Sequence, residues 1–236
     1  THFLQHPSKI PKVIVLTIKD KSKIPKYIID QYQHFARSYK LLVFDDEDCK
    51  EFLKKEYGFE YLQRFEEIEL GAHKADFFRY AYLYKYGGVY FDVKTILLKN
   101  LTDILQDYYD NFYMVYTFTS YPNGSPMIYN GVIATYPKNK VMYDVLQTIF
   151  HQKDLSNYYR ILIDTTEIIR EQITDKQIKL GVNELQSNGR LTIFKEDIKP
   201  RNECKRLDRW GFCTFISDSN NENLFRTRDP DYTPNY

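Results

Sequence analysis

Residues 72–98 read AHKADFFRYAYLYKYGGVYFDVKTILL, and this stretch decides the fold that the sequence predicts. Its first half predicts a helix with Asp76 and Arg79 on one face, because helical residues three apart share a face. Gly87 supplies the left-handed residue that commonly ends a helix. Residues 89–91 are Val, Tyr and Phe, which favour an extended chain. We therefore expect a helix, a glycine stop and a short strand.

The strand after Gly87 is predicted to carry polar side chains to one place. Side chains alternate along a strand. One face would carry Val89, Phe91 and Val93, and the other Tyr90, Asp92 and Lys94. A helical pair such as Asp76 and Arg79 alone contributes only about 0.2–0.5 kcal/mol to stability. Its predicted convergence with the polar face of the strand indicates a functional site.

The pattern ADxxRYxxLYxxGGxYxD over residues 75–92 resembles the DxD-motif glycosyltransferases of the Och1-like mannosyltransferase type. Relatives of that family include the glucosyltransferase domains of large clostridial toxins. Two flanking segments, IPK at 10–12 and LVFDDE at 42–47, are similar to the family's IPKxIHxxW and LWxDE segments. The resemblance covers roughly the first 135 residues, a span long enough for most of one domain.

The resemblance implies an α/β fold of the GT-A type, with a Rossmann-like mixed sheet flanked by helices and an irregular carboxyl-terminal lobe. We expect a single domain over residues 1–236, since this length suits one core. Residues 1–135 would bind the nucleotide sugar, and residues 136–236 would form the helical and acceptor-side part. The implied enzyme is a hexosyltransferase that uses a UDP- or GDP-sugar and acts with retention. Its acceptor hydroxyl would belong to a glycan, a lipid-linked molecule or a protein.

The candidate site residues fall into three groups. Those expected to bind the donor sugar are Asp76, Arg79, Tyr90, Asp92 and Asn130. Those expected at the nucleotide are Leu16, Thr17, Lys19 and Lys94, because the carboxyl end of an apolar strand over 12–18 would face the ligand crevice. Those expected to act in catalysis are Asp92, Lys94 and Arg79. No residue is named as a nucleophile.

Asn130 and Gly131 interrupt the apolar pattern of a strand predicted over 128–134. A polar residue and a glycine inside a strand indicate either a bulge or the close approach of a ligand, and both alternatives stay open. The family also has a small-residue segment in the loop before a later helix. Residues 164–166, Asp-Thr-Thr, are the candidate counterpart, although such residues before a helix usually cap it.

Lys94 departs from the family pattern, which places a second acid two residues after the first. A DxD pair holds a divalent cation that also grips the diphosphate, and an ammonium cannot be a ligand of that cation. We expect that no metal is required and that Lys94 replaces the cation at the diphosphate. The alternative is Mn²⁺ or Mg²⁺ bound through Asp92 and the diphosphate, with a further ligand from residues 218–223. A third alternative is a site that binds without catalysis.

The remaining periodicity predicts the other elements. Helices are expected from Pro25 to Phe35, from Asp45 to Tyr57, and over 59–67, 101–108, 138–150 and 158–173, and strands over 41–44, 112–118, 191–194 and 212–216, before a polar tail over 217–236. Residues 121–126 predict a turn or loop. Trp210 is a candidate for ring stacking or a lid, or else a core residue.

Composition restricts the partners and the compartment. The chain has 33 Lys and Arg against 32 Asp and Glu, so no strong field favours nucleic acid. Cys204 and Cys213 could pair in an oxidising compartment, but an odd total of three cysteines makes a reducing cytosol the simpler expectation. No apolar run reaches the roughly 20 residues of a membrane span. We expect a cytoplasmic protein, or a lumenal or membrane-associated one if an anchor precedes Thr1.

Two rival functions are separable by sequence features. The missing second acid favours a catalytically inactive nucleotide-sugar or glycan-binding module on the same scaffold. A nucleotidyltransferase would need a glycine-rich phosphate loop after the first strand. Residues 17–22 contain no glycine, which excludes that reading.

Overall fold

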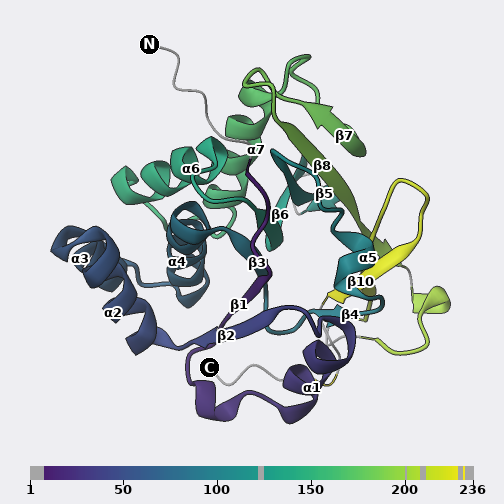
Figure 1. The fold of residues 1–236 in the computed structure, drawn as a ribbon, viewed down its shortest axis with the longest axis horizontal. Coiled ribbons are helices and arrows are strands. Elements are labelled where there is room, and N and C mark those ends of the chain that lie inside the picture. Colours follow the sequence, from purple (N-terminus) through teal and green to yellow (C-terminus); the bar gives the residue numbers. More distant parts are fainter. Residues whose placement is uncertain (1–7, 122–124, 200, 208–210, 228–230, 232–236) are drawn as a thin grey trace.

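The computed structural model describes residues 8–121, 125–199, 201–207, 211–227 and 231. Within these residues, ten strands form one mixed sheet in the order β2-β1-β3-β6-β5-β8-β9-β10-β4, with β7 paired to β8. Helices lie on both faces of the sheet (Figure 1). The mixed sheet flanked by helices confirms the predicted α/β class.

The element bounds are as follows. The strands are β1 (Val13–Thr17), β2 (Lys40–Phe44), β3 (Gly88–Phe91), β4 (Ile96–Leu97), β5 (Asn111–Tyr121), β6 (Ser125–Thr135), β7 (Gly181–Glu184), β8 (Arg190–Lys199), β9 (Cys213–Ser217) and β10 (Asn223–Thr227). The α-helices are α1 (Lys26–Phe35), α2 (Asp46–Tyr57), α3 (Phe59–Glu67), α4 (Gly71–Tyr86), α5 (Leu101–Ile104), α6 (Lys140–His151) and α7 (Arg160–Gln172). Short 3-10 turns cover Lys21–Lys23 and Arg201–Glu203.

Six strands of the sheet point the same way; β10 is one of them, because β9 is antiparallel to both β8 and β10. β1 pairs in parallel with β2 and β3, and β5 pairs in parallel with β8. β6 is antiparallel to both β3 and β5, so β3 and β5 also share a direction. The carboxyl ends of β1, β2, β3, β5 and β8 therefore lie at one edge of the sheet, where ligands of open α/β sheets bind.

Two buried clusters of side chains lie on opposite faces of the sheet. One contains Val15, Tyr90 and Met114 with the helices α2, α3, α4, α6 and α7. The other contains Leu16 and Phe91 with α1 and α5. The assignment of Tyr90 and Phe91 to opposite clusters confirms the alternation predicted from the sequence.

Helix α4 is buried on nearly every side. Residues 76–83 are all buried, so this helix lacks the exposed polar face of an ordinary surface helix. It ends at Gly87, whose φ of 65° lies in the left-handed region and whose N–H donates to the Leu83 carbonyl at 2.9 Å. A Cβ on Gly87 would lie 2.7 Å from the Thr135 carbonyl oxygen, so this turn requires glycine.

Several predicted boundaries are wrong. β3 ends at Phe91, and Asp92 begins a turn in which the Thr95 N–H donates to the Asp92 carbonyl at 2.9 Å. The predicted tail contains β10, and β7 was not predicted. Residues 164–166 lie inside α7 and not before it, so they cap no helix. Helix α5 is also shorter than predicted, because it ends at Ile104.

Other predictions are confirmed. Asp45 and Asp48 form the expected cap of α2, each carboxylate accepting from the other's backbone N–H at 3.0 Å.

Trp210 and residues 122–124 of the predicted loop lie outside the described residues. No helix in the described part of the chain has both the length and the apolar character to span a membrane.

Candidate active site

Arg79 lies at the centre of the candidate site. Its Nη1 donates to the Asn130 carbonyl at 2.5 Å and to Asn130 Oδ1 at 3.1 Å. Its Nη2 lies 3.1 Å from Asp76 Oδ1 and 3.4 Å from Asp92 Oδ1. The guanidinium also sits 4.2 Å above the centre of the Tyr90 ring. The fixed fork of arginine therefore joins α4, β6 and the turn after β3.

Asn130 closes the inner side of this cluster. Its Nδ2 donates to Asp76 Oδ1 at 2.9 Å, while its Oδ1 accepts from Arg79. The backbone is irregular here: the pairing of β6 with β5 shifts between Tyr113 and Val115, opposite residues 130–133. The strand is thus irregular at Asn130, and the Asn130 side chain contacts Asp76 and Arg79 on α4. Asn130 is 6% exposed, so its outer atoms reach little solvent.

Asp92 forms the outer side of the cluster. One carboxylate oxygen accepts from the Tyr90 hydroxyl at 3.4 Å, and the other accepts from the Tyr129 hydroxyl at 3.3 Å. The Lys94 ammonium lies 3.4 Å from Asp92 Oδ2. Side-chain exposure rises from 5% at Arg79 to 20% at Asp92 and 37% at Lys94. The site is therefore a packed polar cluster whose accessible end is Asp92 and Lys94.

Gly131 lets Tyr129 reach Asp92. A Cβ at position 131 would lie 2.2 Å from the Tyr129 hydroxyl oxygen and 2.7 Å from Asp92 Oδ2. The Gly131 carbonyl also accepts from the Asp92 N–H at 2.8 Å. The groups that lie close to this position in the structure are the protein's own Tyr129 phenol and Asp92 carboxylate.

The charges of the cluster set the pKa values of its acids. Burial raises the pKa of Asp92, but the Lys94 and Arg79 charges outweigh burial and hold it below its ordinary value of 3.8. Burial raises the pKa of Asp76 above 3.8 in spite of the Arg79 charge. Burial also raises the pKa of the Tyr90 and Tyr129 phenols. At neutral pH, Asp92 is therefore ionised while both phenols keep their protons.

The predicted nucleotide residues differ in where their side chains lie. The Thr17 hydroxyl is 2.7 Å from the Tyr90 hydroxyl, which joins the end of β1 to the cluster. Leu16 is fully buried in the core cluster on the other face of the sheet. Lys19 is exposed just beyond β1.

Asp92 is the residue through which a divalent cation was the alternative to Lys94. The described residues contain no group of three or more His, Cys, Asp or Glu side chains arranged to hold a metal ion. Both Asp92 oxygens already face cationic or hydroxyl donors, including the Lys94 ammonium. Asp218 does not join Asp92 in such a group. Its carboxylate accepts from the backbone N–H groups of Asn220 and Glu222 in the β9–β10 turn.

Residues 164–166 lie behind the site rather than in it. Thr165 and Thr166 are buried in α7. The Thr165 hydroxyl is 3.4 Å from the Tyr80 hydroxyl, and Thr166 accepts from the Ile128 N–H at 2.9 Å. Asp164 pairs with Arg160 at 2.9 Å on the outer side of the helix.

Sequence reasoning missed Tyr129 and Glu196. Tyr129 lies next to Asn130 in a strand already predicted to hold a site residue, and this adjacency is the signal that could have found it. Glu196 is 1% exposed on β8, where its Oε2 accepts from the Thr117 hydroxyl at 2.5 Å. No partner is described for its buried Oε1 within the described residues. Nothing in the local sequence marks Glu196 as buried, because its position depends on the long-range pairing of β5 with β8.

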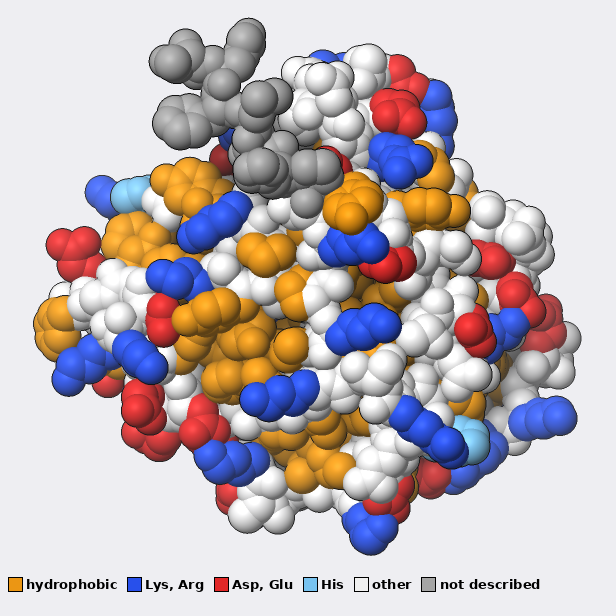
Figure 2. All heavy atoms as spheres, in the orientation of Figure 1, with side chains coloured by type: hydrophobic (Ala, Val, Ile, Leu, Met, Phe, Trp, Pro, Cys, Tyr) orange, Lys and Arg blue, Asp and Glu red, His pale blue; other side chains and the backbone are white. Residues whose placement is uncertain are grey.

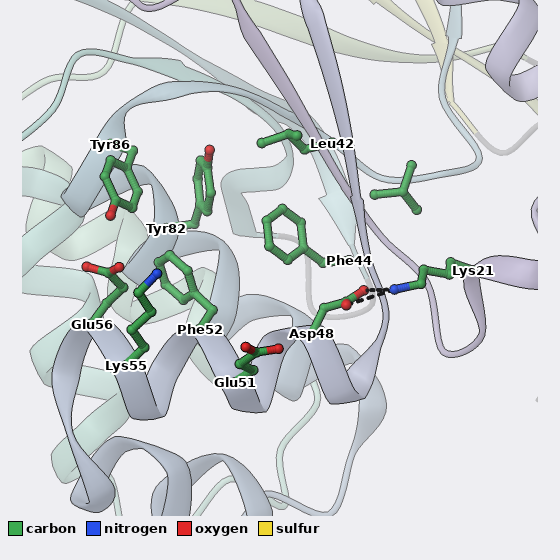
Figure 3. Close-up of a pocket in the computed structure, with 11 residues that line it drawn as sticks. Lys21, Leu42, Phe44, Asp48, Glu51, Phe52, Lys55, Glu56, Tyr82 and Tyr86 are labelled. Carbon is green, nitrogen blue, oxygen red and sulfur yellow. Dashed lines mark hydrogen bonds and ion pairs between the residues drawn. The ribbon is translucent and has the colours of Figure 1, made fainter.

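A separate groove of about 380 Å³ lies beside the edge strand β2, between α2 and α4 (Figure 3). Its apolar lining consists of Leu42, Val43, Phe44, Phe52, Tyr82 and Tyr86. Figure 2 shows hydrophobic side chains gathered over this part of the molecule. Lys21 and Asp48 close one end with an ion pair of 2.6 Å. None of the polar cluster residues lines this groove, so it is distinct from the candidate site.

Comparisons with known proteins bear on the site and on the fold. Residues 19–110, which include the site from Asp76 to Lys94, match the family described as the glycosyltransferase sugar-binding region containing the DXD motif. Over 173 residues the chain is 29% identical to an uncharacterized glycosyltransferase of Acanthamoeba polyphaga mimivirus, a match over 70% of this chain and 65% of that protein. Over 208 residues it is 24% identical to a mannosyl phosphorylinositol ceramide synthase of Saccharomyces cerevisiae, covering 86% of this chain and 52% of that one.

The chain thus spans less than two thirds of the length of these two relatives. Among solved structures, the PaToxG glycosyltransferase superimposes with a TM-score of 0.53 at 16% identity, over 71% of each chain. The sequence matches confirm the resemblance predicted from residues 75–92, and the structural match confirms the predicted type of fold.

Proposed function

We propose that this chain is a glycosyltransferase of the GT-A type that moves a hexose from a nucleoside-diphosphate sugar to an acceptor hydroxyl. Retention of anomeric configuration and a UDP- or GDP-sugar donor are part of the proposal. The observation that carries it is the convergence of Asp76, Arg79, Asp92 and Lys94 at the carboxyl edge of the sheet.

The graded exposure of the cluster suggests a role for each side chain. Asp92, with its lowered pKa, is ionised and accessible enough to accept hydrogen bonds from sugar hydroxyls. Arg79 is almost fully buried, so it acts by holding Asp76, Asp92 and Asn130 in place and by supplying positive charge. Tyr90 supports the guanidinium from below. The donor sugar would rest at the accessible end of the cluster, against Asp92, with Asp76 and Asn130 behind it.

Lys94 is proposed to stabilise the leaving diphosphate. Negative charge grows on that phosphate in the transition state, and a fixed ammonium offsets it without a metal ion. Lys94 is the most exposed charged group of the cluster and sits beside the sugar-binding carboxylate. The position of the Lys94 ammonium, 3.4 Å from Asp92 Oδ2, supports this choice over Mn²⁺ or Mg²⁺.

Two further features bear on the acceptor and the compartment. The yeast relative is named for a phosphorylinositol ceramide product, which supports a lipid-linked acceptor over a free glycan or a protein. Cys204 and Cys213 form a disulfide with Cα atoms 5.8 Å apart. Disulfides persist in oxidising compartments, so this bond supports a lumenal location over the cytoplasmic one.

The test is release of nucleotide from a panel of UDP- and GDP-sugars, with and without EDTA. We expect turnover that EDTA leaves unchanged. Lys94→Ala should lower turnover about 10²- to 10³-fold, the usual effect of removing one group that stabilises transition-state charge. Added Mn²⁺ should not restore it.

Lys94→Asp provides a matched comparison, because it recreates the paired acids of the family motif. This variant should regain activity only when Mn²⁺ is added. Loss of the parent's activity in EDTA would reverse the assignment of Lys94. Binding of nucleotide sugars without turnover under every condition would favour the rival function, an inactive binding module.

A further inference from the structure

The strand β2 stands at one end of the sheet and, among the described residues, pairs with β1 alone. The Lys40 N–H and the Phe44 carbonyl form hydrogen bonds of 3.0 Å with residues that flank β1. Along a strand, successive residues turn their N–H and C=O groups to opposite sides. Leu41 and Val43 therefore turn these backbone groups away from β1. Within the described part of the chain, no hydrogen bond to them is recorded.

The apolar groove beside β2 borders this outward edge. Leu42 and Phe44 line the groove from the strand, and Phe52, Tyr82 and Tyr86 line it from α2 and α4 (Figure 3). Leu42 and Phe44 are only half-buried, and Tyr86 is 44% exposed. The edge therefore combines unpaired backbone groups with accessible apolar side chains.

β2 also lacks most features that keep an edge strand from pairing with another chain. Such features include proline, a bulge, or charged side chains along the strand. The strand reads KLLVF, without proline, and its register with β1 runs through five residue pairs without a shift. Its charged residue, Lys40, lies at its first position. A regular apolar edge of this kind is a template for a further strand.

We propose that β2 pairs with β2 of a second copy of this chain, antiparallel and about a two-fold axis that passes through Leu42. Leu41 of each copy then lies opposite Val43 of the other, in hydrogen-bonded pairs, because both residues turn their backbone groups outward. This register satisfies every outward donor and acceptor of both strands. Leu42 lies opposite Leu42 of the second copy, in a pair without hydrogen bonds whose side chains approach closely. The proposal does not depend on glycosyl transfer.

The charges at the two ends of β2 favour a second copy in this orientation. Lys40, at the amino end, is exposed, and no ion pair is recorded for it within the described residues. The carboxyl end leads into residues 45–48, Asp-Asp-Glu-Asp, at the start of α2. Asp46 is the acid of this group without a recorded ion pair in that part of the chain. Antiparallel pairing brings Lys40 of each copy to the acidic end of the other, so β2 is complementary to itself, as a two-fold interface requires.

The proposed dimer leaves both candidate active sites open. Each site lies at the carboxyl edge of its sheet, and β2 runs in the direction of β3, which leads to Asp92. Because the two β2 strands are antiparallel, the carboxyl edges of the two sheets point in opposite directions. Each copy could therefore bind its own substrates.

The first test is sedimentation of the full chain over a range of concentrations. We expect a dimer that dissociates on dilution. Val43→Pro removes an outward N–H and leaves the hydrogen bonds between β2 and β1 in place, so it should weaken the dimer about tenfold. A parent that stays monomeric at every concentration its solubility allows would overturn the proposal and leave this edge to an extended segment of another protein.

A charge exchange tests the orientation without changing the backbone. Lys40→Glu and Asp46→Lys should each weaken the dimer, and the double variant should restore it, because opposite charges again meet across the interface. Lys153→Glu, at an exposed position after α6, is the matched control and should dimerise like the parent. A dimer that Lys40→Glu weakens no more than Lys153→Glu would show that another surface pairs the copies.

Cross-linking tests the register. Leu42→Cys places two thiols opposite each other across the two-fold axis, at the distance of a pair without hydrogen bonds. Mild oxidation should therefore give a covalent dimer that migrates at twice the chain mass in a non-reducing gel. Lys153→Cys controls for chance encounters between exposed thiols. Equal cross-linking of the two variants would contradict the register, and this result does not depend on whether Val43→Pro folds.

Discussion

Gly131 lies where other side chains fill the space that a Cβ atom would occupy. Gly131→Ala would drive a methyl group into the Tyr129 hydroxyl and Asp92, which are 2.2 and 2.7 Å from the Cβ position. We expect turnover to fall about 10²-fold and the free energy of unfolding to fall by about 1–3 kcal/mol, as overpacking usually costs. Nucleotide-release kinetics and urea unfolding measure the two effects.

Gly71→Ala is the control for that substitution. Gly71 lies in the first turn of α4, and a Cβ there would meet no atom within 4 Å. This variant should keep full activity and gain slightly in stability, because alanine lowers the entropy of the unfolded chain. A Gly131→Ala protein as active as Gly71→Ala would show that the contact between Tyr129 and Asp92 is dispensable.

Because Glu196 is buried, we expect the free energy of unfolding to depend on pH. Burial raises its pKa above the ordinary value of 4.5, opposed by the Thr117 hydrogen bond and the Lys94 charge. Below pH 4.5 the carboxyl is protonated in both folded and unfolded states. As pH rises through the folded-state pKa, the unfolded state has already ionised, so stability falls.

Glu196→Gln should remove this loss, and its stability relative to the parent should therefore rise between pH 4.5 and pH 7. Urea unfolding at both pH values measures the difference. Glu69→Gln, at an exposed position, controls for the removal of one negative charge. A parent and a Glu196→Gln variant with parallel pH profiles would contradict the raised pKa of the buried Glu196 carboxyl.

The sequence predicts which residues within one continuous segment meet in the site, but it does not predict which residues from distant segments join them. Asp76, Arg79, Tyr90 and Asp92 meet because helical and strand periodicities are local, and residues 76–92 are contiguous. Tyr129 and Glu196 depend on strand pairings to distant segments, and no local pattern specifies those pairings. The division of roles among these residues, and the metal requirement, stay predictions.

Helices and strands are predicted correctly where one local feature, such as an apolar run, a helix cap or a glycine stop, marks them. The apolar run of β1, the Asp45 cap of α2 and the glycine end of α4 all lie where the sequence indicates. β10 was missed because its segment, NLFRT, sits in a polar tail and has only two apolar residues. Its formation depends on β4 and β9, which supply partners on both sides.

The Cys204–Cys213 disulfide is expected to stabilise the lobe formed by β8, β9 and β10. It closes a loop with a sequence separation of 9. Replacing both cysteines by serine should lower the free energy of unfolding by about 2–3 kcal/mol. Dithiothreitol should shift the unfolding midpoint of the parent and leave that of the double variant unchanged.

Thiol counting checks the pairing itself. Cys49 is the free cysteine and is buried in α2. Iodoacetamide should therefore modify one cysteine in the unfolded, unreduced protein and all three after reduction. Modification of three cysteines without reductant would show that the bond does not form.

Across the whole molecule, the parallel strands and the two helical layers direct every charged group of the site toward one edge. Lys94 lies two residues before the short strand β4, which pairs with β10 of the carboxyl-terminal lobe. That lobe therefore joins the sheet beside the segment that carries Lys94.

Arg79 lies in a segment of α4 whose residues are all buried, and this burial should slow hydrogen exchange at their backbone amides. Because residues 76–83 are enclosed by the core, their N–H groups should take up deuterium only when the entire protein unfolds. Peptides from α4 should then be among the slowest to gain mass, with or without donor. Rapid labelling of α4 in the unliganded protein would mean that nucleotide sugar has to organise the guanidinium and its acids on arrival.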